Sequence, residues 1–374
     1  MPTLRAAPES RAATFHPRTR RVWPLLLPGG LALMAGLWLG LVRLGWELPV
    51  WARLATAAHG PLMVAGFLGT LIGVERAVAL GRRWAFAAPV LSGVGALVLI
   101  AAPRSALGGC LLLAGAFALL AVAVRQARLW RGLPSTIMAA GVAALAVADA
   151  LWLAGEPIHR FVLWWAAFPV LVVAGERLEM NRIAPAPPAA RVVFAACIAA
   201  FLLGLLASLV WWDGGTRATG LAMAGLGAWL ARYDLARRTM RSRGLPRYVA
   251  VCLLSGIGWL VGGGTLALVL GGTLPGPHYD AVLHSCFVGF VLPMIFGHAP
   301  IILPAVTGFP LPYRPFFYLP LALLNLSLLV RVGGDLVGWM PGRQFGGLLN
   351  VAAVLLFAAG AAVAAAGAGK RAAP

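Results

Sequence analysis

The sequence predicts an all-α polytopic membrane protein, built as a helical bundle of about twelve transmembrane helices. Of the 374 residues, 61% are apolar and 11% are charged, whereas soluble domains are about 45–50% apolar and about 25% charged. Long uncharged stretches also recur from one end of the chain to the other. This composition excludes an ordinary soluble domain, a disordered chain and a fibrous protein.

A membrane-spanning helix needs about 20 mostly apolar residues. Twelve such segments are expected, at 24–46, 52–80, 84–103, 105–124, 134–154, 158–178, 190–212, 217–236, 246–271, 279–303, 316–338 and 344–368. The segments lack the strict alternation of a membrane β-strand, so they are predicted to be helices. In the tenth segment, Pro300 and Pro304 are expected to kink, break or end the helix.

The basic residues predict how the bundle is oriented. With both termini in the cytoplasm, 23 of the 30 lysines and arginines fall on the cytoplasmic side, as the positive-inside rule requires. This asymmetry accounts for the net charge of +19 without nucleic acid, so a nucleic-acid partner is excluded. We expect a bacterial inner-membrane protein with a cytoplasmic arginine-rich tail (1–22), an uncleaved first helix, one transmembrane domain (23–369) and a cytoplasmic C-terminal tail (370–374).

Three of the expected segments share a pattern. The second contains His59, Gly66-Phe67 and Glu75, the sixth His159, Ala167-Phe168 and Glu176, and the tenth His284, Gly289-Phe290 and His298. Because these segments are four helices apart, the chain is interpreted as three pseudo-repeated units of four helices. Chance similarity between short matches is the alternative interpretation.

Two intramembrane histidines are candidate haem ligands. His59 and His284 both lie roughly 8–11 Å inside the outer boundary, counted at 1.5 Å per helical residue. Two neutral imidazoles from facing helices can hold a haem b where small residues let the macrocycle approach. Gly66, Gly69 and Gly289 follow the two histidines and are the candidate small residues. The alternative is that each histidine only bonds a neighbouring helix.

A second layer of ionisable residues is expected roughly 21 Å deeper along the helix axis. It contains Glu75, Glu176 and His298, and His298 is also a further candidate metal ligand. With Asp149 in the fifth segment, these glutamates form a candidate proton or ion path, because ionisable groups at membrane depth are costly. The alternative is a set of structural ion pairs at the membrane interface. Asp234, beside Arg232, is expected to be interfacial.

The run His59-Gly-Pro-Leu-Met-Val-Ala-Gly-Phe-Leu, with Leu283-His284 and Gly297-His298, resembles the NnrS-type membrane proteins. The twelve-helix pattern resembles the wider heme-copper oxidase subunit I superfamily, to which that family belongs. The resemblance implies a haem-containing protein of nitric-oxide metabolism, with His59 and His284 as axial ligands. The superfamily's copper site needs histidines in the sixth and seventh helices, but the sixth has only His159 at its rim and the seventh has none. Ser285 and Cys286 stand where a further haem ligand is expected, so copper and oxygen reduction are not expected.

The leading hypothesis is a haem-b-binding membrane protein that acts in electron transfer or nitric-oxide-related metabolism, with the lipid bilayer and a redox protein as partners. The alternative is a proton-coupled secondary transporter that uses intramembrane Glu, Asp and His residues. A structural or assembly protein without a cofactor is the third hypothesis. The sequence assigns no catalytic residue.

Overall fold

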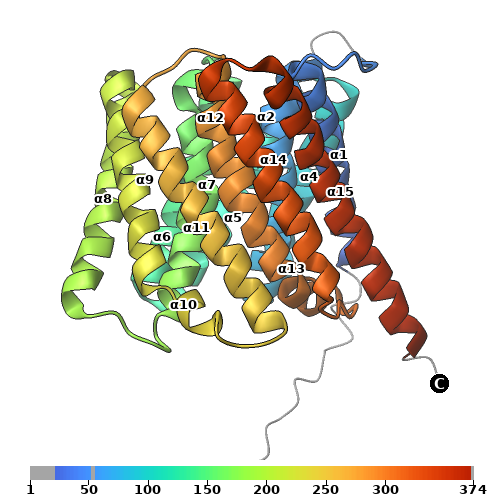
Figure 1. Ribbon diagram of the computed structural model, residues 1–374, viewed down its shortest axis with the longest axis vertical. Coiled ribbons are helices and arrows are strands. Elements are labelled where there is room, and N and C mark those ends of the chain that lie inside the picture. The colour runs from blue at the N-terminus through green and yellow to red at the C-terminus, as the bar shows by residue number, and fades with distance from the viewer. Residues whose placement is uncertain (1–21, 52–54, 372–374) are drawn as a thin grey trace, which may run out of the picture.

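The fold was determined as a computed structural model that describes residues 22–51 and 55–371. Apart from Val22, the predicted N-terminal tail lies outside the described residues, as do the last three residues of the predicted C-terminal tail. Throughout the described residues the regular secondary structure is helical, without a strand. The predicted helical bundle is therefore confirmed (Figure 1).

Among residues 22–51 and 55–371, eleven helical segments are long and apolar enough to cross a membrane. They are Trp23–Arg43 (η2, α1), Ala55–Leu80 (η3, α2, η4, α3), Arg83–Ala101 (η5, α4), Ala106–Trp130 (α5), Leu133–Leu153 (α6), Ile158–Met180 (α7), Pro188–Val210 (α8), Leu245–Leu270 (α11), Pro277–Thr307 (α12, η6, α13), Pro315–Val337 (η7, α14) and Met340–Ala368 (α15). The last of these helices runs on to Arg371. These segments follow the predicted spans closely.

The one predicted span missing from these eleven, expected at 217–236, is α9 (Trp212–Tyr233), which is long enough to cross but less apolar. Three charged residues, Asp213, Arg217 and Arg232, lower its apolar character. It packs along both α8 and α11. Gly220 and Gly264 make this contact close, because a Cβ on Gly264 would lie 2.5 Å from the backbone nitrogen of Ala224. Small residues that let backbones approach are the usual basis of helix packing in membranes.

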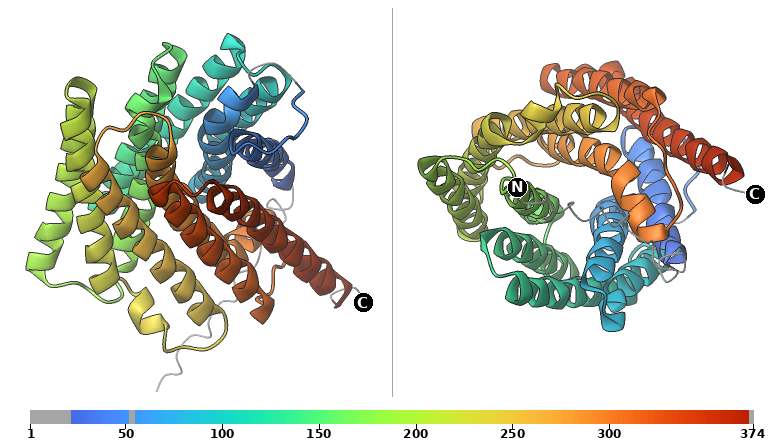
Figure 2. Two further views of the ribbon diagram at one scale, coloured as in Figure 1. Left: turned by 45° about the horizontal axis from the view of Figure 1, so that its top comes forward. Right: turned by 90° about the horizontal axis from the view of Figure 1, so that it is seen from below.

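The three segments with the shared pattern are the most enclosed helices of the bundle. Within an apolar 18-residue stretch of each span, the share of buried residues is 67% for Ala55–Leu80, 78% for Ile158–Met180 and 61% for Pro277–Thr307. It is at most 44% for the other spans. Viewed along the helices, the chain closes into a ring in which α15 comes back beside α1 (Figure 2). Each four-helix unit therefore contributes one helix to the interior, as the repeat interpretation requires.

Two π-helical segments strengthen the equivalence of the second and tenth spans. The segments η4 (Leu62–Leu68) and η6 (Ser285–Val291) are each seven residues long. The Gly66-Phe67 pair and the Gly289-Phe290 pair occupy the fifth and sixth positions of their segments. Single π turns inside α-helices are rare and occur frequently at functional sites. The α7 helix has no such segment and instead contains Pro169.

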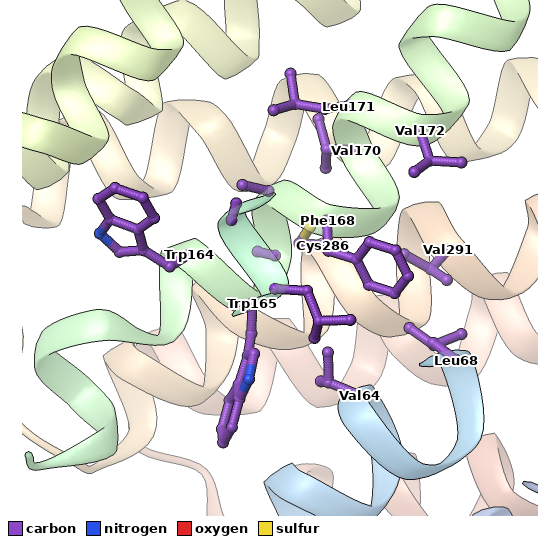
Figure 3. Packing of buried hydrophobic residues seen from close by; sticks show 14 of the residues in the cluster. Val64, Leu68, Trp164, Trp165, Phe168, Val170, Leu171, Val172, Cys286 and Val291 are labelled. Atoms are coloured by element: carbon purple, nitrogen blue, oxygen red, sulfur yellow. The ribbon is translucent and has the colours of Figure 1, made fainter. Parts of the chain in front are cut away.

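Apolar side chains fill the centre of the bundle, where the three enclosed helices meet. Phe168 of α7 lies between Val64 and Leu68 of η4 and Val291 of η6 (Figure 3). All four side chains are buried. We call this group the central plug.

Pro300 and Pro304 neither break nor end the tenth span, which were two of the three effects expected of them. The α13 helix (Leu292–Thr307) continues through both prolines and stops where Gly308 adopts a left-handed conformation, with φ of +74°. Glycine adopts this conformation without steric cost, which is why it commonly follows a helix C-terminus.

Candidate functional site

We call the end of the bundle where α1 begins and α15 ends the inner end, and the opposite end the outer end. His59 lies near the outer end, in the first turn of α2 (His59–Pro61). Its Nδ1 donates to the carbonyl oxygen of Gly36 in α1 (Leu26–Arg43) at 2.8 Å. The ring lies over Gly40, where an added Cβ would be 3.1 Å from the imidazole Cε1. The backbone of α1 therefore fixes both the orientation and the tautomer of His59, leaving Nε2 as a lone-pair donor.

His284 ends α12 (Pro277–His284) at a comparable depth. Its Nδ1 lies 3.0 Å from the carbonyl oxygen and 3.1 Å from the carboxylate of Asp280. The guanidinium of Arg331 donates to its Nε2 at 3.1 Å. Because arginine is only a donor, Nε2 carries the lone pair here as well.

Asp280 and Arg331 extend this site into α14 (Tyr318–Val337). The Arg331 guanidinium donates from Nε at 3.1 Å and from Nη2 at 2.8 Å to one carboxylate oxygen of Asp280. One helical turn further, Asp335 is paired with Arg343 of α15 (Met340–Arg371). None of these residues was predicted from the sequence as part of a site. The available signal was Asp280 four residues before His284, a spacing that places both on one helix face.

The two candidate haem ligands approach each other. His59 lies within electrostatic range of His284, Arg43 and Arg331. The four side chains come from α1, α2, α12 and α14, so two imidazoles and two guanidinium groups gather at the outer end. We call these four residues the outer site.

Partly exposed side chains recur along the second and tenth spans. His59, Met63, Phe67, Leu71 and Glu75 are partly exposed, every fourth residue of the second span. On the tenth span the partly exposed side chains include His284, Val288, Ile295 and His298. Since His59 is in range of His284 and Glu75 is in range of His298, the two rows of side chains adjoin at both ends. We call this interface the seam.

The glycines expected to admit a haem have other contacts. A Cβ on Gly66 would lie 3.0 Å from the Cβ of Ala96 and 3.2 Å from that of Ala32, and one on Gly69 would lie 3.3 Å from the Ser92 hydroxyl. Gly289 packs against the indole of Trp259. These glycines bring helices together rather than line a haem slot, so that part of the prediction was wrong.

At the inner end, an open cavity of about 660 Å³ lies between α3 (Gly69–Leu80), α6 (Leu133–Leu153), α7 (Ile158–Met180) and α13. We call it the vestibule. Glu75, Glu176 and His298 all line it. The guanidinium of Arg76 joins the two glutamates, 3.4 Å from the Glu75 carboxylate and directly paired with that of Glu176. The three residues predicted to share the inner layer are therefore brought together.

Asp234 lies at the C-terminal end of α9, and its side chain is buried within the protein. It accepts from Arg177 through Nε at 2.8 Å and Nη2 at 3.2 Å. One of its oxygens also accepts the backbone N–H of Ala236 at 2.7 Å. Arg232, which is near Asp234 in sequence, lies over the ring of Tyr233 instead.

Asp149 is fully buried near the outer end of α6, apart from the vestibule. One carboxylate oxygen accepts from the indole of Trp165 at 2.8 Å, and the other has no hydrogen-bond partner among the described residues. The same indole packs against Gly60, next to His59 in the chain. Asp149 is thus nearer to the outer site than to Glu75 or Glu176.

His159 lies at the outer rim, at the start of α7, where its ring meets that of Trp212 edge to face with centroids 5.2 Å apart. It therefore lies apart from the vestibule and packs against an aromatic side chain. This placement agrees with its description as a rim residue.

The enclosed helices, the central plug and the polar groups at both ends define a multi-pass helical membrane protein. The model of a family described as a domain of unknown function (DUF8744) matches residues 21–366, nearly the whole chain. The chain belongs to this family. A search of curated proteins found no match.

Proposed function

We propose that the chain binds one haem b at the outer site, with His59 and His284 as axial ligands, and that it transfers electrons. The observation that carries this proposal is that both imidazoles donate from Nδ1 to a backbone carbonyl and present Nε2 as the lone pair. Histidines that ligate metals almost always have their other nitrogen fixed in this way. A π-helical segment follows each histidine within three residues.

The donor set suits a haem iron. His59 and His284, at the outer end of the seam, are both partly exposed, so neither ring is fully enclosed by protein. Arg331 now bonds His284 Nε2, so it must withdraw from that atom when iron binds. Arg331 and Arg43 would then offset the negative charge of the haem propionates.

A haem with two imidazole ligands supplies one-electron transfer, because neither axial position is open to a substrate. The role of this chain's residues is to orient both imidazoles through the hydrogen bonds of their Nδ1 atoms. The link to nitric-oxide metabolism stays an expectation from the NnrS resemblance. An electron-transfer role further implies a redox partner protein at one membrane face.

The test is a dithionite-reduced minus oxidised optical spectrum of the detergent-purified protein, isolated from cells supplied with haem. We expect a b-type α-band in the wild type and in His159→Ala, and its loss in His59→Ala and His284→Ala. His159→Ala is the matched control, because His159 is also at the outer end but lies apart from the outer site. A wild type without the band, or a band that persists in both ligand variants, refutes the proposal.

Proton-coupled transport is the second candidate function. Its supporting observation is the vestibule of about 660 Å³, which is lined by carboxylates and an imidazole. The glutamates Glu75 and Glu176 would be the coupling groups, with Asp149 as a further protonatable group in the outer half. Proton flux into proteoliposomes that requires Glu75 and Glu176, in a protein without haem, would favour this candidate over the first.

We further propose that the protein resides in a bacterial inner membrane with its inner end toward the cytoplasm. The arginine distribution supports this orientation through the positive-inside rule. Single cysteines placed at Arg83 and Arg160 of a cysteine-free variant test it, because these residues lie at opposite ends of the bundle. Only the second cysteine should react with an impermeant maleimide added to intact spheroplasts.

A further inference from the structure

Three arginines gather at the inner end, where α8 begins and α9 ends. The indole Nε1 of Trp229 donates to the carbonyl oxygen of Ala190 at 2.6 Å, which fixes the level of α9 against that of α8. Arg191 follows Ala190 directly, and Arg232 comes three residues after Trp229. Arg237, in the short helix after α9, donates from its guanidinium to the carbonyl oxygen of Arg232 at 3.2 Å. We call Arg191, Arg232 and Arg237 the arginine cluster.

The chain around the arginine cluster is held in place by other residues. Asp234 accepts two hydrogen bonds from Arg177, and one of its oxygens also accepts a backbone N–H. The helix that follows, α10 (Ala236–Thr239), packs against α11 at the inner end of the bundle (Figure 1). The acidic residue nearest to the cluster in sequence is therefore already engaged, and its position does not depend on the three arginines.

The arginine cluster favours an anion from outside the chain. All three of its side chains belong to exposed residues, and within 22–51 and 55–371 none of them is paired with a carboxylate. Like charges that gather without a counter-charge repel one another. Guanidinium groups bind phosphate oxygens through two parallel hydrogen bonds, which makes phosphate a well-matched anion for this surface.

An exposed apolar surface begins directly beside the arginine cluster. Val192 and Val193 follow Arg191 in the first turns of α8 and are 69% and 52% exposed. Exposed apolar side chains continue along this span and include Leu203 and Leu206. Because α8 is long and apolar enough to cross the membrane, this face meets the acyl chains of lipids. The cluster therefore lies at the level where the hydrocarbon ends and the headgroups begin.

We propose that the arginine cluster binds the phosphate of an anionic phospholipid whose acyl chains lie along the exposed face of α8. Basic clusters immediately beside a membrane span are typical binding surfaces for anionic lipids. The positive-inside rule accounts for the number of arginines at the inner end, but not for their gathering beside one exposed apolar face. This inference depends neither on haem binding nor on proton transport.

The experiment is native mass spectrometry of the detergent-purified protein, titrated with phosphatidylglycerol and separately with phosphatidylcholine of the same acyl chains. We expect the wild type to bind the first phosphatidylglycerol at least about ten-fold more tightly, since each arginine near an anionic lipid surface contributes about five-fold in affinity. The triple variant Arg191→Gln/Arg232→Gln/Arg237→Gln should lose this preference. The corresponding triple lysine variant keeps the charges but not the paired hydrogen bonds, so its affinity for phosphatidylglycerol should be intermediate.

The matched control is Arg125→Gln/Arg128→Gln/Arg131→Gln, which removes three exposed arginines at the inner end of α5 and should keep the preference. Equal affinity of the wild type for both lipids would overturn the inference. An equal loss in the two glutamine triples would also overturn it, because the attraction would then come from the total charge of the inner end. A preference that excess glycerol phosphate abolishes would identify a site for a free anion instead of a lipid. Far-UV circular dichroism establishes that each variant is folded.

Discussion

The ion pair between Arg177 and Asp234 allows a quantitative test of the described packing. The substitution Asp234→Asn keeps the shape and an oxygen for the Ala236 N–H but removes the negative charge. Arg177 then remains with a side chain that is only 9% exposed and has lost its partner. Breaking one partner of a buried pair typically costs about 3–5 kcal/mol. The lower end of this range, about 3 kcal/mol, is expected because water in the vestibule reaches Arg177.

The matched control is the double variant Arg177→Met/Asp234→Asn, which removes the stranded charge as well. It should be more stable than Asp234→Asn alone, because replacing a whole buried pair by uncharged groups is often nearly neutral. Reversible unfolding in mixed detergent and dodecyl sulfate, followed by circular dichroism, measures the free energy of each variant. The reasoning is refuted when Asp234→Asn lies within about 1 kcal/mol of the wild type, or when the double variant is the less stable one.

Further predictions concern helix contacts and pH. Gly264→Ala should destabilise the protein by several kcal/mol in the same assay, because its Cβ would meet the backbone of α9. Gly262→Ala is the control, because a Cβ there meets open space, and it should be neutral or stabilising by up to about 1 kcal/mol. Gly40→Val should displace the ring of His59 and abolish the b-type band, while the helical circular dichroism is kept. An unchanged band would contradict the described packing of the His59 ring on Gly40. Arg217 donates a hydrogen bond to Asp213 at the exposed start of α9, and this bond lowers the pKa of the Asp213 carboxyl. The stability that this carboxylate contributes is therefore present above its unfolded pKa and is lost as the pH falls through the folded value. The difference in thermal midpoint between the wild type and Asp213→Asn should therefore shrink on acidification; a constant difference from pH 7 to 3 would count against this account.

The architecture could be predicted because the bilayer imposes a simple rule on sequence. Apolar stretches of the required length place the spans, and the recurrence of a small residue before phenylalanine placed Gly66 and Gly289 at matching positions of two interior helices. Helix α9 was predicted although its charges lower its apolar character, because the stretch between Arg217 and Arg232 carries no charge. The π-helical segments could not be foreseen, since no residue type specifies them.

The partners in the ion pairs were harder to predict than the depth at which the ionisable residues lie. Arg232 is near Asp234 in sequence, but the partner is Arg177, which comes from another helix. Likewise Arg331 is distant in sequence from His284, and only the packing of α12 against α14 brings them together. Such pairs depend on helix rotation, which hydrophobicity alone does not set in a bundle that is apolar on nearly every side.

The most direct test of the proposed outer site is the electron paramagnetic resonance spectrum of the oxidised, haem-supplied protein. The account predicts the signal of low-spin ferric iron, one per chain, because two imidazole nitrogens occupy both axial positions. In His59→Gly this signal should give way to a high-spin signal from iron that has kept only His284. A wild type with no ferric haem signal, or one that is high-spin and unaffected by substitution of either histidine, would contradict the assignment of His59 and His284 as a ligand pair.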